Sequence, residues 1–172
     1  MSQDNYYLNL STFQDHCTIR EVMGKERIQI SNLVNMYDPQ CVLDEVKTTV
    51  YMAYSDFNFD PVEHAFKDIL NLFHGKYPGY RQCNTKYHDL RHTSDAFLAM
   101  VRLIHGAVLE GEKIGMGNVS LALITTLLHD TGYIQTENDH SGTGAKYTLI
   151  HVERTIEFMK KYFTGNGFSK AQ

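Results

Sequence analysis

Apolar residues recur at helical spacing in five stretches of the chain from residue 38 onward. Two of these stretches open with an Asp-Pro pair, Asp38-Pro39 and Asp60-Pro61. Proline is favoured in the first turn of a helix and aspartate can cap it, and Glu63 completes an Asp-x-x-Glu variant of the capping box. The pattern therefore predicts helices that begin near residues 38 and 60, the second ending at the glycines and proline of HGKYPGY.

Three further helices are predicted: one from near Tyr87, one that follows a cap at Asn118, and one from about Tyr147. The run VSLALITTLLHD is apolar nearly all round, which is typical of a central helix. The polar, glycine-rich stretch TGYIQTENDHSGTGAK is predicted to be a loop. In the last helix, apolar residues at 3-4-3-4 spacing predict the buried seam. They are Leu149, Val152, Ile156, Met159 and Phe163.

These elements predict an all-α fold, a bundle of five or more helices formed by residues 38–172. Residues 1–37 are predicted to be a separate N-terminal arm. It is expected to be irregular or partly β: it could hold two short strands around Gly24-Lys25, or form an extended arm, because the segment RIQI alternates polar and apolar residues.

Composition narrows the classes of partner. The 172 residues, 42% of them apolar, suit one domain with its own core. The net charge is −4 and no Lys/Arg block is present, which argues against a nucleic-acid polymer as partner. No stretch approaches the roughly 18 apolar residues of a membrane span. Cys17, Cys41 and Cys83 are odd in number and form no CxxC pair, so we expect reduced thiols in a cytoplasmic protein. Self-association into a homodimer stays open.

Two motifs carry the candidate chemistry. YHDLRHTSD places His88 and His92 four residues apart, and TTLLHDTGY ends an apolar run in His129-Asp130. Imidazoles at i and i+4 of a helix can converge on one metal ion, or one can bind it while the other faces a substrate. An ionisable pair is costly inside a core unless it binds something. Histidines of the surface, or hydrogen-bonded histidines of the core, are the alternative interpretation.

The two motifs, in this order on an all-helical background, resemble the HD-domain superfamily of metal-dependent phosphohydrolases. YHDLRHTSDA is similar to the YHNxxHAxDV signature of the class I cyclic-nucleotide phosphodiesterase catalytic core, and the resemblance covers about residues 85–163. It implies His92, His129 and Asp130 as ligands of a divalent metal ion (Mn, Mg, Fe, Zn or Ni). It also implies His88 as the general acid and Asp95 as a residue that orients a ligand histidine.

Other positions differ from the pattern or extend it. Asp89 stands where the phosphodiesterase motif has Asn, and Tyr133 stands where it has a further His. Two-metal members of the superfamily place a histidine on the helix after the HD motif, so His151 is a candidate for a second metal; a surface histidine is the alternative. The superfamily closes its coordination sphere with an Asp on a later helix, and no aspartate follows Asp139. Either the chain ends before that helix, or another residue substitutes, and Glu153 and Glu157 are the only downstream carboxylates besides Glu137 and Asp139.

The resemblance implies hydrolysis of a small phosphoester, either a nucleotide or a molecule like a cyclic nucleotide. A water activated by the metal would attack phosphorus, and His88 would protonate the leaving group. The alternative is a catalytically degenerate HD module that binds a nucleotide or a protein partner without turnover.

Overall fold

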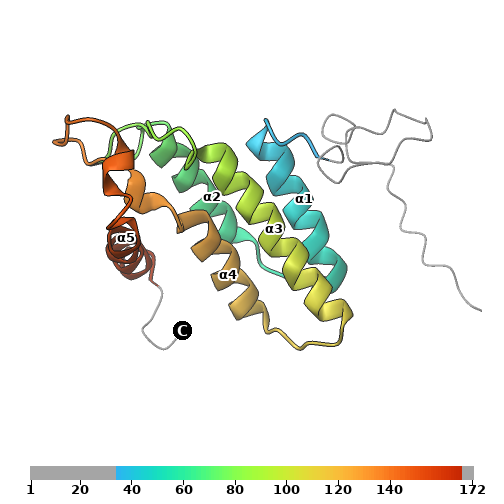
Figure 1. Ribbon diagram of the computed structural model, residues 1–172. Coiled ribbons are helices and arrows are strands. Elements are labelled where there is room, and N and C mark those ends of the chain that lie inside the picture. The colour runs from blue at the N-terminus through green and yellow to red at the C-terminus, as the bar shows by residue number, and fades with distance from the viewer. Residues whose placement is uncertain (1–33, 168–172) are drawn as a thin grey trace, which may run out of the picture.

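The computed structural model describes residues 34–167, and five α-helices make up most of this part of the chain (Figure 1). They are α1 (Pro39–Ala53), α2 (Asp60–Phe73), α3 (Leu90–Leu109), α4 (Met116–Leu128) and α5 (His151–Gly165). Two short 3-10 turns, η2 (Thr131–Tyr133) and η3 (Gly144–Tyr147), lie between α4 and α5. Within residues 34–167 the only β-pairing is an isolated antiparallel bridge. The all-α prediction is confirmed there, whereas the arm predicted for residues 1–37 falls almost entirely outside the described residues.

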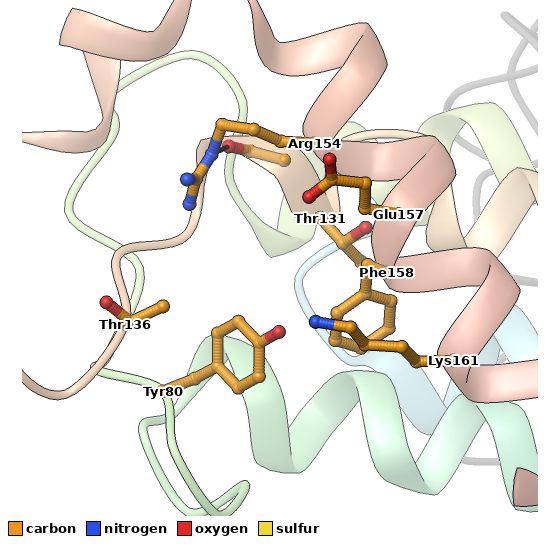
Figure 2. Close-up of a pocket in the computed structure, with 8 residues that line it drawn as sticks. Tyr80, Thr131, Thr136, Arg154, Glu157, Phe158 and Lys161 are labelled. Atoms are coloured by element: carbon orange, nitrogen blue, oxygen red, sulfur yellow. Dashed lines mark hydrogen bonds between the residues drawn. The ribbon is translucent and has the colours of Figure 1, made fainter.

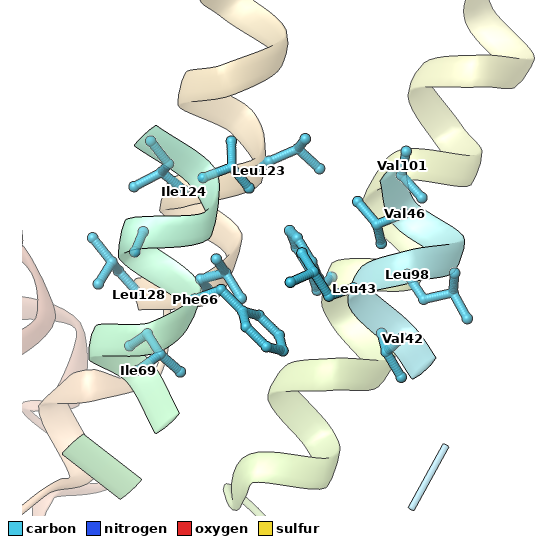
Figure 3. Packing of buried hydrophobic residues seen from close by; sticks show 14 of the residues in the cluster. Val42, Leu43, Val46, Phe66, Ile69, Leu98, Val101, Leu123, Ile124 and Leu128 are labelled. Atoms are coloured by element: carbon cyan, nitrogen blue, oxygen red, sulfur yellow. The ribbon is translucent and has the colours of Figure 1, made fainter. Parts of the chain in front are cut away.

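Four of the helices form the main part of one core, and α5 adds Phe158 and Tyr162 to it. α1 packs on α3, α3 on α4, and α4 on α2. Each contributes fully or nearly fully buried aliphatic and aromatic side chains to the space between them, as Figure 3 shows. The labelled residues are Val42, Leu43 and Val46 of α1, Phe66 and Ile69 of α2, Leu98 and Val101 of α3, and Leu123, Ile124 and Leu128 of α4. α5 lies to one side of this layer and packs mainly against η2 (Figure 1).

The first two helices begin where the Asp-Pro pairs predict, but only one of them is capped as predicted. The carboxylate of Asp38 accepts the backbone N–H of Gln40 at 2.9 Å. At α2 the N-cap position is Phe59 and no side chain caps it. The side chain of Asn58 instead accepts the backbone N–H of Asp60 at 3.0 Å. The capping box predicted at Asp60 is therefore wrong, because this aspartate already lies inside the helix.

Glycine residues mark the end of α2 and the start of α4. α2 ends before Gly75, whose φ of +70° lies in the left-handed region that glycine tolerates best. A Cβ at this position would also lie 2.7 Å from the backbone nitrogen of Gln82. α4 begins at Met116 with Gly115 as its N-cap, so Asn118 lies in the first turn and is not the cap that the sequence predicted.

The buried face of α5 differs from the prediction. Its buried residues are Thr155, Phe158 and Tyr162. Most of the predicted seam is exposed instead: three of its five residues lie on the surface, while Met159 and Phe163 pack partly against the core. We call the five residues the outer stripe of α5. Its members are Leu149 (93% exposed), Val152 (54%), Ile156 (45%) and the half-buried Met159 and Phe163.

The thiol prediction is also only partly correct. Cys83 is a free thiol, and burial raises its pKa. Cys41, buried on α1, is disulfide-bonded, which contradicts the expectation of three reduced cysteines. None of the helices in residues 34–167 combines the length and apolar character that crossing a membrane requires.

Candidate metal centre

Three imidazoles converge on one carboxylate oxygen. Oδ2 of Asp130 lies 2.6 Å from Nδ1 of His88, 3.3 Å from Nε2 of His92 and 3.2 Å from Nε2 of His129. The Asp130 side chain is 5% exposed, whereas the three rings are 27%, 27% and 35% exposed. We call these four residues the histidine group. It has a buried carboxylate at its base and half-buried imidazoles around it.

The start of α3 positions two of the imidazoles. The carboxylate of Asp89 accepts the backbone N–H of His92 at 3.0 Å and so caps the helix. The helix begins at Leu90 for this reason, after His88 and not before it as the sequence predicted. His88 is held from outside the helix, where the thiol of Cys83 donates to its carbonyl oxygen at 3.4 Å. The rings of His88 and His92 are nevertheless adjacent, with centroids 5.4 Å apart.

The end of α4 and the η2 turn position the other half of the group. The hydroxyl of Thr155 on α5 accepts the N–H of Gly132 at 2.9 Å and donates to the carbonyl of His129 at 3.0 Å. A Cβ on Gly132 would lie 2.0 Å from the carbonyl oxygen of His151, so this close approach requires glycine. The residues after Asp130 were predicted to be a loop, but residues 131–135 are buried between α4 and α5.

Arginine and amide side chains that belong to no recognisable sequence motif hold this turn. Arg154 donates to the carbonyl oxygens of Gly132 at 2.7 Å and Ile134 at 3.0 Å. The buried amide of Gln135 accepts from the side chain of Asn84 at 2.8 Å. An arginine on a polar helix face resembles a solvated residue, so its sequence context carried no signal of this role.

Tyr133 lies between two histidines. Its ring stacks on His88 with centroids 4.1 Å apart and on His151 with centroids 4.4 Å apart. Nδ1 of His151 lies 2.7 Å from the carbonyl oxygen of Thr148. His151 therefore borders the histidine group through Tyr133. The side chain of Asp95 is exposed on α3 and makes no hydrogen bond or ion pair within residues 34–167, so the structure shows no contact for its predicted orienting role.

The electrostatics of the group favour a positive charge between its members. Nδ1 of His129 lies 2.8 Å from the carbonyl oxygen of Thr126, so it must carry the proton. A neutral His129 then turns its Nε2 lone pair toward Oδ2 of Asp130 and toward Nε2 of His92, 3.3 Å away. Because such lone pairs repel each other, a proton or a cation must lie between them.

In the absence of a cation, a proton meets this need. Burial alone would lower the pKa of His129, but the hydrogen bonds with Asp130 and the Thr126 carbonyl outweigh it and raise that pKa. Burial would raise the pKa of Asp130, but hydrogen bonds from His129 and His88 lower it to about 2. Asp130 is therefore ionised at neutral pH and offers a negative oxygen to whatever cation occupies the centre.

A divalent metal ion fits the same place. Ligand atoms of His88, His92 and Asp130 all lie within 4.8 Å of one another, so this set could hold an ion. His129 offers a fourth nitrogen at a comparable distance from Asp130. The structure thus brings together the residues predicted for the centre, while the division into ligands and general acid stays a prediction. Glu153 and Glu157, the candidate substitutes for a further aspartate, are exposed on α5 and lie outside the set.

Two cavities flank the η2 turn. One of about 350 Å³ opens beside His88 and Tyr133, a size that suits part of a small molecule. Another of about 100 Å³ lies between η2 and α5, where the side chains of Arg154, Lys161 and Tyr80 surround it (Figure 2). No member of the histidine group lines the smaller cavity.

The chain matches no protein-family model, no curated protein and no solved structure.

Proposed function

We propose that the protein is a metal-dependent phosphohydrolase that acts on a small phosphoester, a nucleotide or a molecule like a cyclic nucleotide. The observation that carries this proposal is the convergence of three imidazoles on one buried carboxylate oxygen beside a cavity of about 350 Å³. Nitrogen and oxygen ligands of this kind are typical of hydrolytic metal centres. The order of the YHDLRH and LLHDTGY motifs, which resembles that of HD-domain enzymes, supports the same class.

In this proposal His92, His129 and Asp130 hold a divalent cation. When bound, such a cation supplies Lewis-acid activation of water and of a phosphoryl oxygen. The Thr126 carbonyl fixes the proton of His129 on Nδ1, which keeps the Nε2 lone pair available as a ligand. The single negative charge of Asp130 leaves the centre with a net positive charge, which favours an anionic substrate.

His88 serves as the general acid. In this role its Nδ1–H donates to Asp130 at 2.6 Å, so the carboxylate orients the ring. Nε2 then carries the proton that the leaving alkoxide takes. Stacking on Tyr133 holds the plane of the ring, and the adjacent cavity receives the leaving group.

The departures from the phosphodiesterase signature agree with this assignment. Asp89 caps α3 through a side-chain oxygen, and an asparagine has an equivalent oxygen, so either residue forms the cap. Tyr133 offers His88 and His151 an aromatic face instead of a nitrogen ligand. We therefore propose a centre for one ion.

Metal binding tests the ligand set. Calorimetric titration with Mn²⁺ or Zn²⁺ should give one tight site, and Asp130→Asn or His129→Ala should weaken it by more than about 100-fold, since even residues that only support a ligand cost 10–100-fold. Both variants should lose phosphodiester hydrolysis. His140→Ala, at an exposed loop histidine, is the matched control and should behave as the wild type. Unchanged turnover in His129→Ala would remove that residue from the centre.

The leaving group tests His88. With an alkyl phosphoester, His88→Ala should lower kcat by about 10²–10⁴-fold, the usual contribution of a general acid. With a nitrophenyl ester the leaving group needs no proton, so the same variant should keep most of its activity. An equal loss with both substrates would instead indicate that His88 is a metal ligand.

A second candidate function is a module that binds a nucleotide or a protein partner without turnover. This function is favoured because the histidine group, within residues 34–167, contains one carboxylate, whereas the resemblance implies a second carboxylate ligand. Stoichiometric metal without turnover across a broad panel of phosphoesters would support this module. Hydrolysis that depends on His129 would exclude it.

A further inference from the structure

The outer stripe of α5 exposes a continuous row of large apolar side chains. Leu149 is 93% exposed, Val152 54% and Ile156 45%, and Ile150 beside them is 49% exposed. Single exposed aliphatic residues are common on protein surfaces, but a contiguous row of them marks a contact surface. Covering this row would remove apolar area from water without disturbing the buried face of the helix, which packs on η2.

The spacing of the stripe suits packing against another helix. At about 100° per residue, Val152, Ile156, Met159 and Phe163 fall within one narrow band of α5. Alternating steps of four and three residues form the a and d seam of two packed helices. Leu149 extends the same band into the turn that precedes the helix. Val152 and Ile156 are exposed, whereas Met159 and Phe163 are partly buried against the core, so the band is most accessible along the first half of the helix.

The charges beside the stripe are arranged for self-recognition. Glu153 and Lys160 are both exposed and lie seven residues apart on the flank of the stripe that faces away from the core. A two-fold axis that crosses α5 near Ile156 would place Glu153 of one copy beside Lys160 of an antiparallel second copy, and would do so twice. A parallel pair would leave each charge near its own equivalent. The pattern therefore selects the antiparallel arrangement.

We propose that the outer stripe is the contact surface of a symmetric homodimer, in which α5 packs antiparallel to α5 of a second copy of this chain. Such a contact is isologous and closed, so it ends at the dimer. One face of a single helix also offers less area than the roughly 800 Å² that each partner buries in a typical stable interface. The dimer should therefore form in a concentration-dependent manner and dissociate on dilution.

Sedimentation velocity of the full chain, from low micromolar to near-millimolar concentration, tests the apolar part of the surface. The wild type should shift from monomer to dimer over this range. Ile156→Lys, at the centre of the stripe, should stay monomeric throughout. The matched control is Leu103→Lys on α3, since Leu103 is 69% exposed and lies away from the stripe. Circular dichroism verifies that both variants are folded.

Charge reversal tests the register. Glu153→Lys and Lys160→Glu each turn two attractive pairs into two repulsive ones, so each variant should dimerise about tenfold more weakly. Mixed together, the two variants should form a heterodimer, because every charge then meets its opposite. Lys161→Glu makes the same charge change on the far side of α5 and should leave dimerisation unchanged.

Three outcomes would overturn the proposal. One is a wild type that stays monomeric at near-millimolar concentration. Another is a dimer that persists in Ile156→Lys, which would place the interface elsewhere. The third is a pair of charge variants that do not associate with each other when mixed, which would reject the antiparallel register.

Discussion

The hydroxyl of Thr155 joins α5 to the turn that carries Asp130, and Thr155→Val removes only this hydroxyl. The side chain is 5% exposed, accepts the N–H of Gly132 at 2.9 Å and donates to the carbonyl of His129 at 3.0 Å. Valine has nearly the same shape, so no cavity forms. The substitution leaves the buried N–H of Gly132 without a partner, which costs about 1–3 kcal/mol. It also removes the hydrogen bond to the carbonyl of His129, which contributes about 0.5–1.5 kcal/mol. We expect the free energy of unfolding to fall by about 2–3 kcal/mol.

Urea unfolding followed by circular dichroism measures this loss. With a slope of about 1–3 kcal/mol per molar urea, the midpoint should fall by roughly 1 M. Thr155→Ser keeps the hydroxyl and loses a methyl group, so it should recover most of the lost stability. A valine variant as stable as the wild type, or equal losses of stability in the serine and valine variants, would contradict this role of the Thr155 hydroxyl.

Three further changes test other contacts. Gly132→Ala places a Cβ 2.0 Å from a backbone carbonyl of α5, so it should cost about 1–3 kcal/mol in urea unfolding and weaken metal binding in calorimetry. Phe97→Ala, at a residue with no exposed surface, should cost about 3–5 kcal/mol in the same unfolding assay, against less than about 0.5 kcal/mol for Leu103→Ala. The hydrogen bond from Lys146 lowers the pKa of Asp139, so this pair should stabilise the fold above about pH 4 and lose its contribution as the pH falls further. The difference in stability between wild type and Asp139→Asn should accordingly shrink in acid, and a difference independent of pH would contradict the assignment.

Helix positions could be predicted where strong local signals agreed. Asp38-Pro39 and Asp60-Pro61 mark the starts of α1 and α2 within one residue, and the apolar run before His129 is α4, as predicted. The start of α3 was missed because both His88 and Asp89 suit the first turn of a helix. Only the observed hydrogen bond from the N–H of His92 to Asp89 decides between them.

The buried face of α5 could not be predicted from hydrophobicity. Its outer stripe is the more apolar one, yet Thr155 and Tyr162 face inward. The reason is that the η2 turn has buried backbone groups that need hydrogen-bond partners, and Thr155 satisfies two of them. A pattern of apolar positions contains no information about such a need in another segment.

The histidine group was predictable as a set but not in its detail. Spacing indicated that His88, His92 and the His129-Asp130 pair could meet, and the structure brings them to one oxygen. The stacking of Tyr133 on His88 depends on the path of the chain after α4, which the sequence indicated only as a loop.

α5 is attached to the remainder of the fold through η2, through Phe158 and Tyr162 in the core, and through a hydrogen bond from Tyr162 to Asp68 of α2. Because it packs mainly on a short turn and only slightly on α4, it can open as a unit at a free energy below that of global unfolding, so its amides should exchange with deuterium sooner than those of α3 and α4. Each such opening would also release the backbone of His129 from Thr155. The opening rate of α5 should therefore set an upper limit on the residence time of a ligand bound at the imidazoles.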